Sequence, residues 1–419
     1  DPQLHYVLKL EGRLDEARVR RAVRLAMDAE PVFGCRYVPR NKPFWERRDD
    51  LDSIPLCEVL ETTEVQRELE RFAARPSDAT RDPLVEIRIV RGASDSLCLK
   101  VSHVPADGAG GKELLYLIAT LYRALEKNPS YRVAPNLGVR GAGQLFRRFG
   151  WRRSLAAIAY PALTPPENIW RFPVGDLHDI GTRTFAARRL DPVQSKALRD
   201  YAIDAGATLN DVLLAALFRG LWRFLDFSCK VPQPAWIPVD FRGYLPSGKT
   251  EAICNFVGMM YPTLCRIPGE PFQGTLQRLQ QNSLSTEHRE RFALFYSLLI
   301  ALTHHCFLER IGMRMERVAR KNLETRSTAV HFSNNRTLSL SKLDFGLPIV
   351  DADQFVPAAI PPGLLISVLS FRGSIKFAIT YFDRAMKTED VERFFDTFLE
   401  ELSSVTQQPL LAGAAQTDF

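Results

Sequence analysis

Apolar residues recur along the chain with two different periods, and each period predicts its own kind of element. Residues 85–89 alternate apolar and charged side chains, and after the loop 92–96 the alternation returns over residues 97–101. This pattern predicts a β-hairpin with one buried face. Residues 112–125 and 208–225 instead carry apolar residues at spacings of three and four, which predicts two amphipathic helices.

The other predicted elements are of both kinds and are spread over the whole chain. Strands are expected at residues 4–10, 235–241, 255–264, 329–332, 364–371 and 374–382, and helices at 15–29, within 271–325 and at 388–404. Prolines and glycines break the pattern over residues 129–181, which indicates a crossover between two halves. Because each half mixes strands and helices, we predict an α/β (α+β) protein with two lobes. We expect residues 1–165 to form the N-terminal lobe, 129–181 a crossover with a basic helix, and 182–419 the C-terminal lobe.

Composition and charge exclude several classes of protein. Hydrophobic residues make up 46% of the 419 residues and charged residues 25%, values that exclude a disordered or coiled-coil chain. The net charge of +6 is too small over this length to indicate nucleic-acid binding. Seven scattered cysteines without a CxxC pair fit reduced thiols in a cytoplasmic protein better than a disulfide framework or a zinc site. The chain begins at Asp1 rather than at methionine, which leaves open whether an upstream segment is missing.

The sharpest candidate for chemistry is the segment SHVPADGAGG, residues 102–111, which contains an HxxxDG pattern. His103 continues the inward-facing alternation of residues 97–101, so we expect it to point into the protein at the end of a strand. A histidine that is partly desolvated there can act as a general base with a pKa near the working pH. The glycines that follow allow close approach of a substrate and leave backbone N–H groups free for a developing oxyanion. A hydrogen-bonded core histidine beside a tight turn is the alternative.

With its surroundings, this pattern resembles the condensation-domain and chloramphenicol-acetyltransferase-like superfamily over nearly the whole chain. The superfamily includes non-ribosomal peptide condensation domains, plant-type hydroxyl acyltransferases, alcohol acetyltransferases and polyketide-associated acyltransferases. The HxxxDG motif is specific when the surrounding order of motifs is present. Further segments that resemble motifs of the superfamily are 10–15, 210–216, 238–242, 255–258 and the DFG-type 344–346.

The resemblance implies a pseudo-dimeric, two-lobed sandwich with the histidine in a tunnel between the lobes. It also implies acyl transfer from a thioester to a hydroxyl or an amine. His103 would deprotonate the acceptor, and Gly108 would provide room for the backbone and an oxyanion N–H. Asp107 would be structural and would pair with an arginine, for which Arg242 is the candidate.

Two further positions bear on the chemistry. Ser333 and Asn334 follow a short predicted strand, where members of the superfamily place a hydroxyl or an amide near the tetrahedral intermediate. They are oxyanion or substrate candidates, and a polar turn is the alternative. Peptide-forming condensation domains usually show two adjacent histidines, whereas Ser102 precedes His103 here. This departure favours an alcohol as the acceptor and does not exclude an amine.

Residues 243–250, GYLPSGKT, match the GxxxxGKT pattern of a phosphate-binding loop. That loop requires a helix to begin at its lysine, whereas the residues after Lys249 predict a loop and then a strand. Pro246 would also remove one of the backbone donors that the phosphates need. We therefore interpret this segment as a surface loop between two strands.

The segment 140–153 interleaves basic and large apolar residues, and its arginines are Arg140, Arg147, Arg148, Arg152 and Arg153. A basic amphipathic helix of this kind can lie on an anionic membrane surface or meet an acyl carrier protein or acyl-CoA. Arg147, Arg148, Arg152 and Arg153 are the candidate contacts. A solvated helix that packs on the body of the protein is the alternative.

These observations predict an acyltransferase that moves an acyl group from CoA or an acyl carrier protein to the hydroxyl of a small molecule or lipid. Amide formation on an amine and a non-catalytic binding module are the alternatives. We expect no metal and no tightly bound cofactor, with acyl-CoA or a phosphopantetheinyl thioester as co-substrate. A monomer is expected, because two internal lobes complete the site. The sequence leaves open the acyl chain length, the acceptor and the choice between CoA and a carrier.

Overall fold

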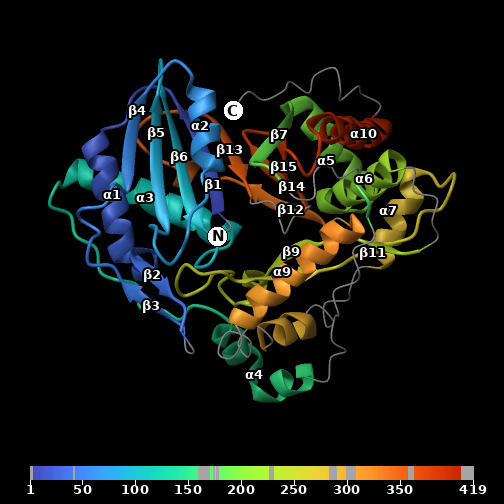
Figure 1. Cartoon of the computed structure of the whole chain (residues 1–419), viewed down its shortest axis with the longest axis horizontal. Coiled ribbons are helices and arrows are strands. Elements are labelled where there is room, and N and C mark those ends of the chain that lie inside the picture. Colours follow the sequence, from blue (N-terminus) through green and yellow to red (C-terminus); the bar gives the residue numbers. More distant parts are fainter. Residues whose placement is uncertain are drawn as a thin grey trace.

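The computed structural model describes residues 3–40, 43–158, 170–172, 175, 179–225, 231–282, 290–298, 308–327, 329–356 and 363–406. Two β-sheets, each packed against helices, form two lobes that lie side by side (Figure 1). The two-lobed α/β (α+β) fold predicted from the sequence is therefore confirmed.

The first lobe is built on a five-stranded sheet with the order β13-β1-β6-β5-β4. Its strands are β1 (Gln3–Leu10), β4 (Cys57–Glu61), β5 (Val85–Arg91), β6 (Asp95–Ser102) and β13 (Ile349–Phe355). Helices α1 (Glu16–Ala29) and α3 (Gly108–Lys127) share a core with one face of this sheet, and α2 (Val65–Ala74) packs on the other. A small hairpin of β2 (Cys35–Val38) and β3 (Phe44–Arg47) follows α1. The predicted hairpin is confirmed as the antiparallel pair β5–β6.

The second lobe contains a four-stranded sheet with the order β12-β14-β15-β7. Its strands are β7 (Arg183–Leu190), β12 (Val330–Thr337), β14 (Leu364–Phe371) and β15 (Ser374–Phe382). The helices that share its core are α5 (Pro192–Asp204), α6 (Leu209–Phe224), α7 (Phe272–Gln281) and α10 (Thr388–Thr406). Thr208 and Asp211 form a capping box at the start of α6, in which each side chain accepts a hydrogen bond from the backbone of the other.

One strand connects the two halves of the chain across the lobes. β13 comes from residues 182–419, the expected C-terminal lobe, but it pairs antiparallel with β1 of the first sheet. Its Phe355 packs against Phe185 of β7 with ring centres 4.9 Å apart. Lys376 of β15 donates hydrogen bonds to Asp351 and Asp353 of β13 at 2.7 and 2.8 Å. The two sheets are therefore joined by aromatic and ionic contacts through this strand.

Two short ladders and three further helical segments, one of them at residues 290–298, are also described. β8 (Gln233–Pro234) pairs with β11 (Thr263–Leu264), and β9 (Ile237–Asp240) pairs with β10 (Val257–Met260). α4 (Gly143–Ile158) lies in the predicted crossover, and α9 (Leu308–Thr325) precedes β12. Over the described ranges, no single helix is long and apolar enough to cross a membrane, although the bent pair α5–α6 meets the same criteria of length and composition. The five cysteines that can be described are free thiols, and Cys229 and Cys306 lie outside the described residues.

Candidate active site

His103 lies directly after β6, where the chain turns toward α3. Its side chain is half-buried, and Asn255 approaches it from the connection between β9 and β10. Asn255 Nδ2 lies 3.3 Å from His103 Nδ1 and donates to the His103 carbonyl at 3.0 Å. Burial lowers the pKa of His103 below 6.5, although a hydrogen bond to its own backbone and the nearby Asp107 carboxylate act in the opposite direction. The imidazole is therefore neutral at pH 7, which is the form that accepts a proton.

Asp107 and Arg242 form a buried ion pair between two distant segments of the chain. Asp107 is 1% exposed and Arg242 3% exposed, and Arg242 Nη1 donates to Asp107 Oδ2 at 2.8 Å. Asp107 also caps α3, since its Oδ1 accepts from Gly110 N at 2.8 Å, and its Oδ2 accepts from Phe256 N at 2.6 Å. The predicted pairing of Asp107 with Arg242 is confirmed. It holds the start of α3 against the β9–β10 connection.

The position of Asp107 also corrects the predicted start of the following helix. The apolar pattern predicts a helix over residues 112–125, whereas α3 begins at Gly108. Asp107 supplies the cap, and the glycines at 110 and 111 lie buried within the first turn rather than in a preceding loop. The backbone N–H groups of Gly110 and Gly111 are bonded to Asp107. Gly108 and Ala109 are therefore the first-turn positions whose N–H groups remain for a ligand.

Beside Gly108 lies Asn335 rather than Asn334. A Cβ atom on Gly108 would lie 2.7 Å from Asn335 Oδ1, and the buried Nδ2 of Asn335 has no hydrogen-bond partner. Ser333 is on the same side, since its hydroxyl lies 3.4 Å from Asn335 Oδ1. Asn334 instead directs its amide to Asn210 of α6, at 3.5 Å. The contacts thus place Asn335 beside Gly108 and Asn334 beside α6, so Asn335 rather than Asn334 is the oxyanion candidate at this position.

Three more residues support the site formed by His103, Gly108 and Asn335, which we call the His103 corner, and the sequence did not indicate them. Lys112 Nζ donates to the Asn335 carbonyl at 2.6 Å, and burial lowers the pKa of Lys112 to about 8. Tyr6 donates to the Gly108 carbonyl at 2.7 Å, and Gln354 Nε2 donates to the Tyr6 hydroxyl at 3.3 Å. Lys112 lies about one helical turn after Gly108, a spacing that could have revealed it. Tyr6 and Gln354 come from β1 and β13, whose pairing leaves no local signal in the sequence.

The segment 243–250 has no helix after its lysine. η2 (Phe241–Tyr244) and turns occupy it, and the next element is the strand β10. The segment is thus a connection between two antiparallel strands, as interpreted from the sequence. A helix N-terminus at Lys249, which a phosphate-binding loop requires, does not occur.

Helix α4 packs on the body at its start and is exposed further along. Leu145 is buried with Phe241 and Phe256, whereas Trp151 is 69% exposed after a kink at Gly150, where φ is 77°. The four arginines of the candidate contact are exposed. Arg147 and Arg153 form ion pairs with Glu251 and Glu290. Arg148 and Arg152 lie over the rings of Phe149 and Trp151. The first half therefore matches the packed alternative, and contact of the second half with a carrier or membrane stays a prediction.

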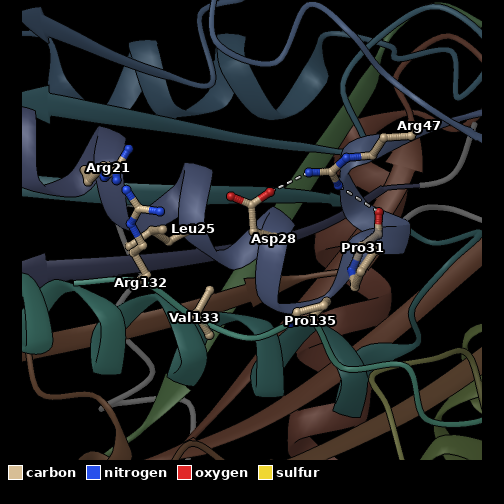
Figure 2. A pocket seen from close by; sticks show the side chains of 8 residues that line it. All are labelled: Arg21, Leu25, Asp28, Pro31, Arg47, Arg132, Val133 and Pro135. Carbon is tan, nitrogen blue, oxygen red and sulfur yellow. Dashed lines mark hydrogen bonds and ion pairs between the residues drawn. The ribbon is translucent and has the colours of Figure 1, made fainter. Parts of the chain in front are cut away.

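A cleft of about 530 Å³ lies away from His103, between α1 and residues 132–135 (Figure 2). Its walls are formed by Arg21, Leu25, Asp28, Pro31, Arg47, Arg132, Val133 and Pro135. Arg47 donates to Asp28 at 2.6 Å and to the Pro31 carbonyl at 3.1 Å, so its charge is already compensated. No residue of the His103 corner lines this cleft. Within the described ranges, histidine, cysteine, aspartate and glutamate form no group of three that could hold a metal ion.

Comparison with curated proteins finds distant relatives. No model of a protein family matches the chain. Uncharacterized proteins from two strains of Mycobacterium tuberculosis, CDC 1551 / Oshkosh and H37Rv, are 28% identical over 273 residues, which is 62% of this chain and 61% of theirs. The alignment thus spans about three fifths of the length of these relatives. Tyrocidine synthase 3 of Brevibacillus parabrevis is 23% identical over 430 residues, which cover 98% of this chain and 6% of that protein.

Solved structures of the same fold cover almost the whole chain. The first condensation domain of the calcium-dependent antibiotic synthetase, in complex with a substrate analogue, superposes with a TM-score of 0.68 at 16% identity, over 99% of this chain and 93% of that one. The epimerization domain of tyrocidine synthetase B gives 0.67 at 14% identity, over 98% and 92%. Polyketide synthase associated protein 5 from Mycobacterium tuberculosis gives 0.64 at 17% identity, over 96% and 95%. The chain therefore has the condensation-domain fold, which confirms the resemblance at the level of fold.

Proposed function

We propose that this protein is an acyltransferase that uses a thioester donor and His103 as the general base. The observation that carries the proposal is the neutral His103 at the end of β6, next to the first turn of α3 and the unpaired amide of Asn335. A base and a hydrogen-bond donor at one corner are what acyl transfer requires. The condensation-domain fold supports this reading, because solved neighbours include condensation domains.

In the proposed reaction, the acceptor hydroxyl or amine attacks the thioester carbonyl while its proton moves to the ring of His103. We assign the accepting atom to Nε2, which requires that Nδ1 carry the ring proton and donate it to the His103 carbonyl, the same oxygen to which Asn255 Nδ2 donates. The carbonyl oxygen becomes an oxyanion, which Asn335 Nδ2 and the N–H groups of Gly108 and Ala109 stabilise. The C–S bond then breaks, and the thiolate takes the proton from His103. No net proton is consumed.

Lys112 and Asp107 position this machinery rather than take part in it. Lys112 holds the backbone of Asn335, and Asp107 holds the start of α3 through Arg242. Both contacts join segments that are more than a hundred residues apart in the sequence. A displacement of about 1 Å at such a site costs up to 100-fold in rate.

We propose a hydroxyl acceptor, because Ser102 stands where peptide-forming condensation domains usually have a second histidine. Amide formation on an amine is the second candidate, supported by the 23% identity with tyrocidine synthase 3 over 98% of this chain. A binding module that has lost catalysis is the third. A soluble acyl-CoA or an acyl carrier protein is proposed as donor, and the exposed end of α4 is proposed as a contact for a carrier or lipid surface.

The experiment measures thiol release from acyl-CoAs of increasing chain length in the presence of pooled alcohols and pooled amines. Turnover that is lost in His103→Ala would support the proposal, and the active pool would decide between ester and amide formation. Asn335→Ala should lower kcat about 100-fold by removing an oxyanion donor, whereas Asn334→Ala, the adjacent matched control, should stay near wild type. A folded His103→Ala variant with unchanged turnover would contradict the proposal.

A further inference from the structure

Three aromatic rings lie together at the edge of the second sheet, where β12 is the outermost strand. Trp236, directly before β9, forms an isolated parallel bridge with His331 of β12. The centres of these two rings lie 5.1 Å apart, and the ring of Tyr261 packs on Trp236 at 4.8 Å. All three side chains are partly exposed. We call Trp236, Tyr261 and His331 the aromatic group.

The aromatic group shares one face of β12 with the His103 corner. Val330 and Phe332 point into the core of the second lobe, so His331 and Ser333, which alternate with them, point to the opposite face. The Ser333 hydroxyl lies 3.4 Å from Asn335 Oδ1 and is therefore on the same side as Asn335. His331 and Asn335 are four residues apart, which is about 13 Å along a strand. This face thus leads from the proposed oxyanion position to the aromatic group.

The strands beside β12 carry apolar side chains over the same distance. Pro238 follows Trp236 by two residues and pairs with Met259 of β10. Pro238 and Met259 are partly exposed, and Trp236 and Met259 belong to none of the hydrophobic cores formed by the described residues. Their sequence neighbours Ile237 and Met260 instead pack against two of these cores. The face with Pro238 and Met259 can therefore contact an apolar chain of a ligand.

Two polar atoms of the aromatic group are buried without a hydrogen-bond partner. They are Trp236 Nε1 and His331 Nδ1, whereas the indole nitrogens of Trp170 and Trp222 donate to Pro234 and Gln233. Buried polar atoms are nearly always paired, and an indole N–H can only donate. A hydroxyl oxygen meets both needs, because it accepts from the indole and either donates to or accepts from the imidazole.

We propose that the aromatic group binds a hydroxyl group on the acyl chain of the donor, about ten carbons from the thioester carbonyl. The inference rests on the proposed function and deepens it, because it names the class of acyl chain. In the proposed reaction the thioester carbonyl lies at Asn335, where the face begins. With C–C bonds of about 1.5 Å, a zigzag chain of about ten carbons spans the 13 Å to His331. A plain alkyl chain would leave Trp236 Nε1 unpaired, which weakens binding.

Calorimetric titration of the whole chain with decanoyl-pantetheine and ω-hydroxydecanoyl-pantetheine tests this recognition. Pantetheine is the part that CoA and a carrier-protein arm share, and no acceptor is added, so that binding is measured without transfer. Wild type should bind the hydroxylated thioester about 10-fold more tightly, which corresponds to one hydrogen bond to an otherwise unpaired group. Equal affinities would overturn the proposal, because water would then serve the two nitrogen atoms equally well.

Two variants assign the preference to the indole N–H. Trp236→Phe keeps an aromatic ring and removes the donor, so it should bind both thioesters with equal affinity. Trp45→Phe is the matched control, because Trp45 is a partly exposed tryptophan of β3 in the first lobe. It should keep the wild-type preference. A folded Trp236→Phe variant that still preferred the hydroxylated thioester about 10-fold would also overturn the proposal.

Because the titration does not depend on turnover, this inference and the proposed function fail separately. If wild type released no thiol with any acceptor but still bound the hydroxylated thioester more tightly, the acyltransferase proposal would fail and the recognition of the chain would stand. If wild type bound both thioesters equally and transferred both chains with the same kcat/KM, acyl transfer would stand and the recognition of the hydroxyl would fail.

Discussion

Replacement of Asp107 by asparagine removes a negative charge from a position that is 1% exposed. The carboxylate accepts three hydrogen bonds, from Gly110 N, Phe256 N and Arg242 Nη1, at 2.8, 2.6 and 2.8 Å. An asparagine has one acceptor oxygen, so its amide N–H₂ group must face one of these donors. The variant therefore loses hydrogen bonds and also leaves a buried arginine with less compensation.

The magnitude follows from what remains around Arg242. Breaking a buried ion pair costs about 3–5 kcal/mol when the surviving charge is left unpaired. Arg242 keeps a hydrogen bond to Asp240 at 3.1 Å and one to the Cys254 carbonyl at 2.8 Å. Burial lowers the pKa of Arg242, but its contacts with Asp107 and Asp240 raise the pKa further than burial lowers it. We therefore expect Asp107→Asn to cost about 3 kcal/mol, at the lower end of that range.

Urea unfolding followed by circular dichroism measures this cost, provided that the slope m is unchanged. Asp240→Asn is the matched control, because the Asp240 side chain is 31% exposed and contacts the same nitrogen. It should cost about 1 kcal/mol or less. The double variant Asp107→Asn/Arg242→Met should cost about 2 kcal/mol less than the sum of its single changes. Equal costs for the two aspartates, or strict additivity, would refute the argument that the buried pair holds the start of α3 against the β9–β10 connection.

The remaining predictions concern the base, the glycine and a second histidine. If His103 is the base, kcat/KM should be constant above its pKa and fall tenfold per unit below it, with the midpoint below pH 6.5 because burial lowers the pKa; a midpoint above 6.5 in a pH profile would contradict this. Gly108→Ala should displace the Asn335 side chain and lower turnover about 100-fold, while the free energy of unfolding changes by less than about 1 kcal/mol. An active variant would argue against a role of Asn335. The pKa of buried His331 is lowered to about 4, so the unfolded state takes up a proton first as pH falls below 6.5. Relative to His331→Phe, wild type should lose about 2 kcal/mol of stability between pH 7.5 and pH 5 in urea titrations, and equal losses would contradict burial of that ring.

The local elements were the part of the fold that the sequence predicted well. The hairpin of residues 85–101 and the final helix follow from side-chain alternation and helical spacing, which depend on near neighbours only. The predicted start of α3 was wrong by four residues because the cap at Asp107, rather than the apolar pattern, begins the helix. β13 was not predicted, since its sequence IVDADQF mixes apolar and charged residues and its place depends on a distant partner.

The candidate site was likewise predicted only in part from the sequence. The segment 102–111 placed a histidine, an aspartate and glycines at the junction of a strand and a helix, and the resemblance supplied Arg242 as partner of Asp107. Ser333 and Asn334 were the predicted candidates, whereas Asn335 lies beside Gly108, because the register of β12 against β14 shifts directly after Asn334, which the sequence does not reveal. Tyr6, Gln354 and Lys112 could be assigned only once their contacts were known.

By itself, the sequence determined the class of fold, the local elements and the residue types that carry the proposed chemistry. These properties follow from periodicity and from spacings of a few residues, which are visible in one dimension. Only the tertiary structure decided which distant side chains meet: His103 with Asn255, Gly108 with Asn335, and Asp107 with Arg242. Burial decides the protonation of these groups, and burial depends on strand pairing and packing between segments that lie far apart in the chain.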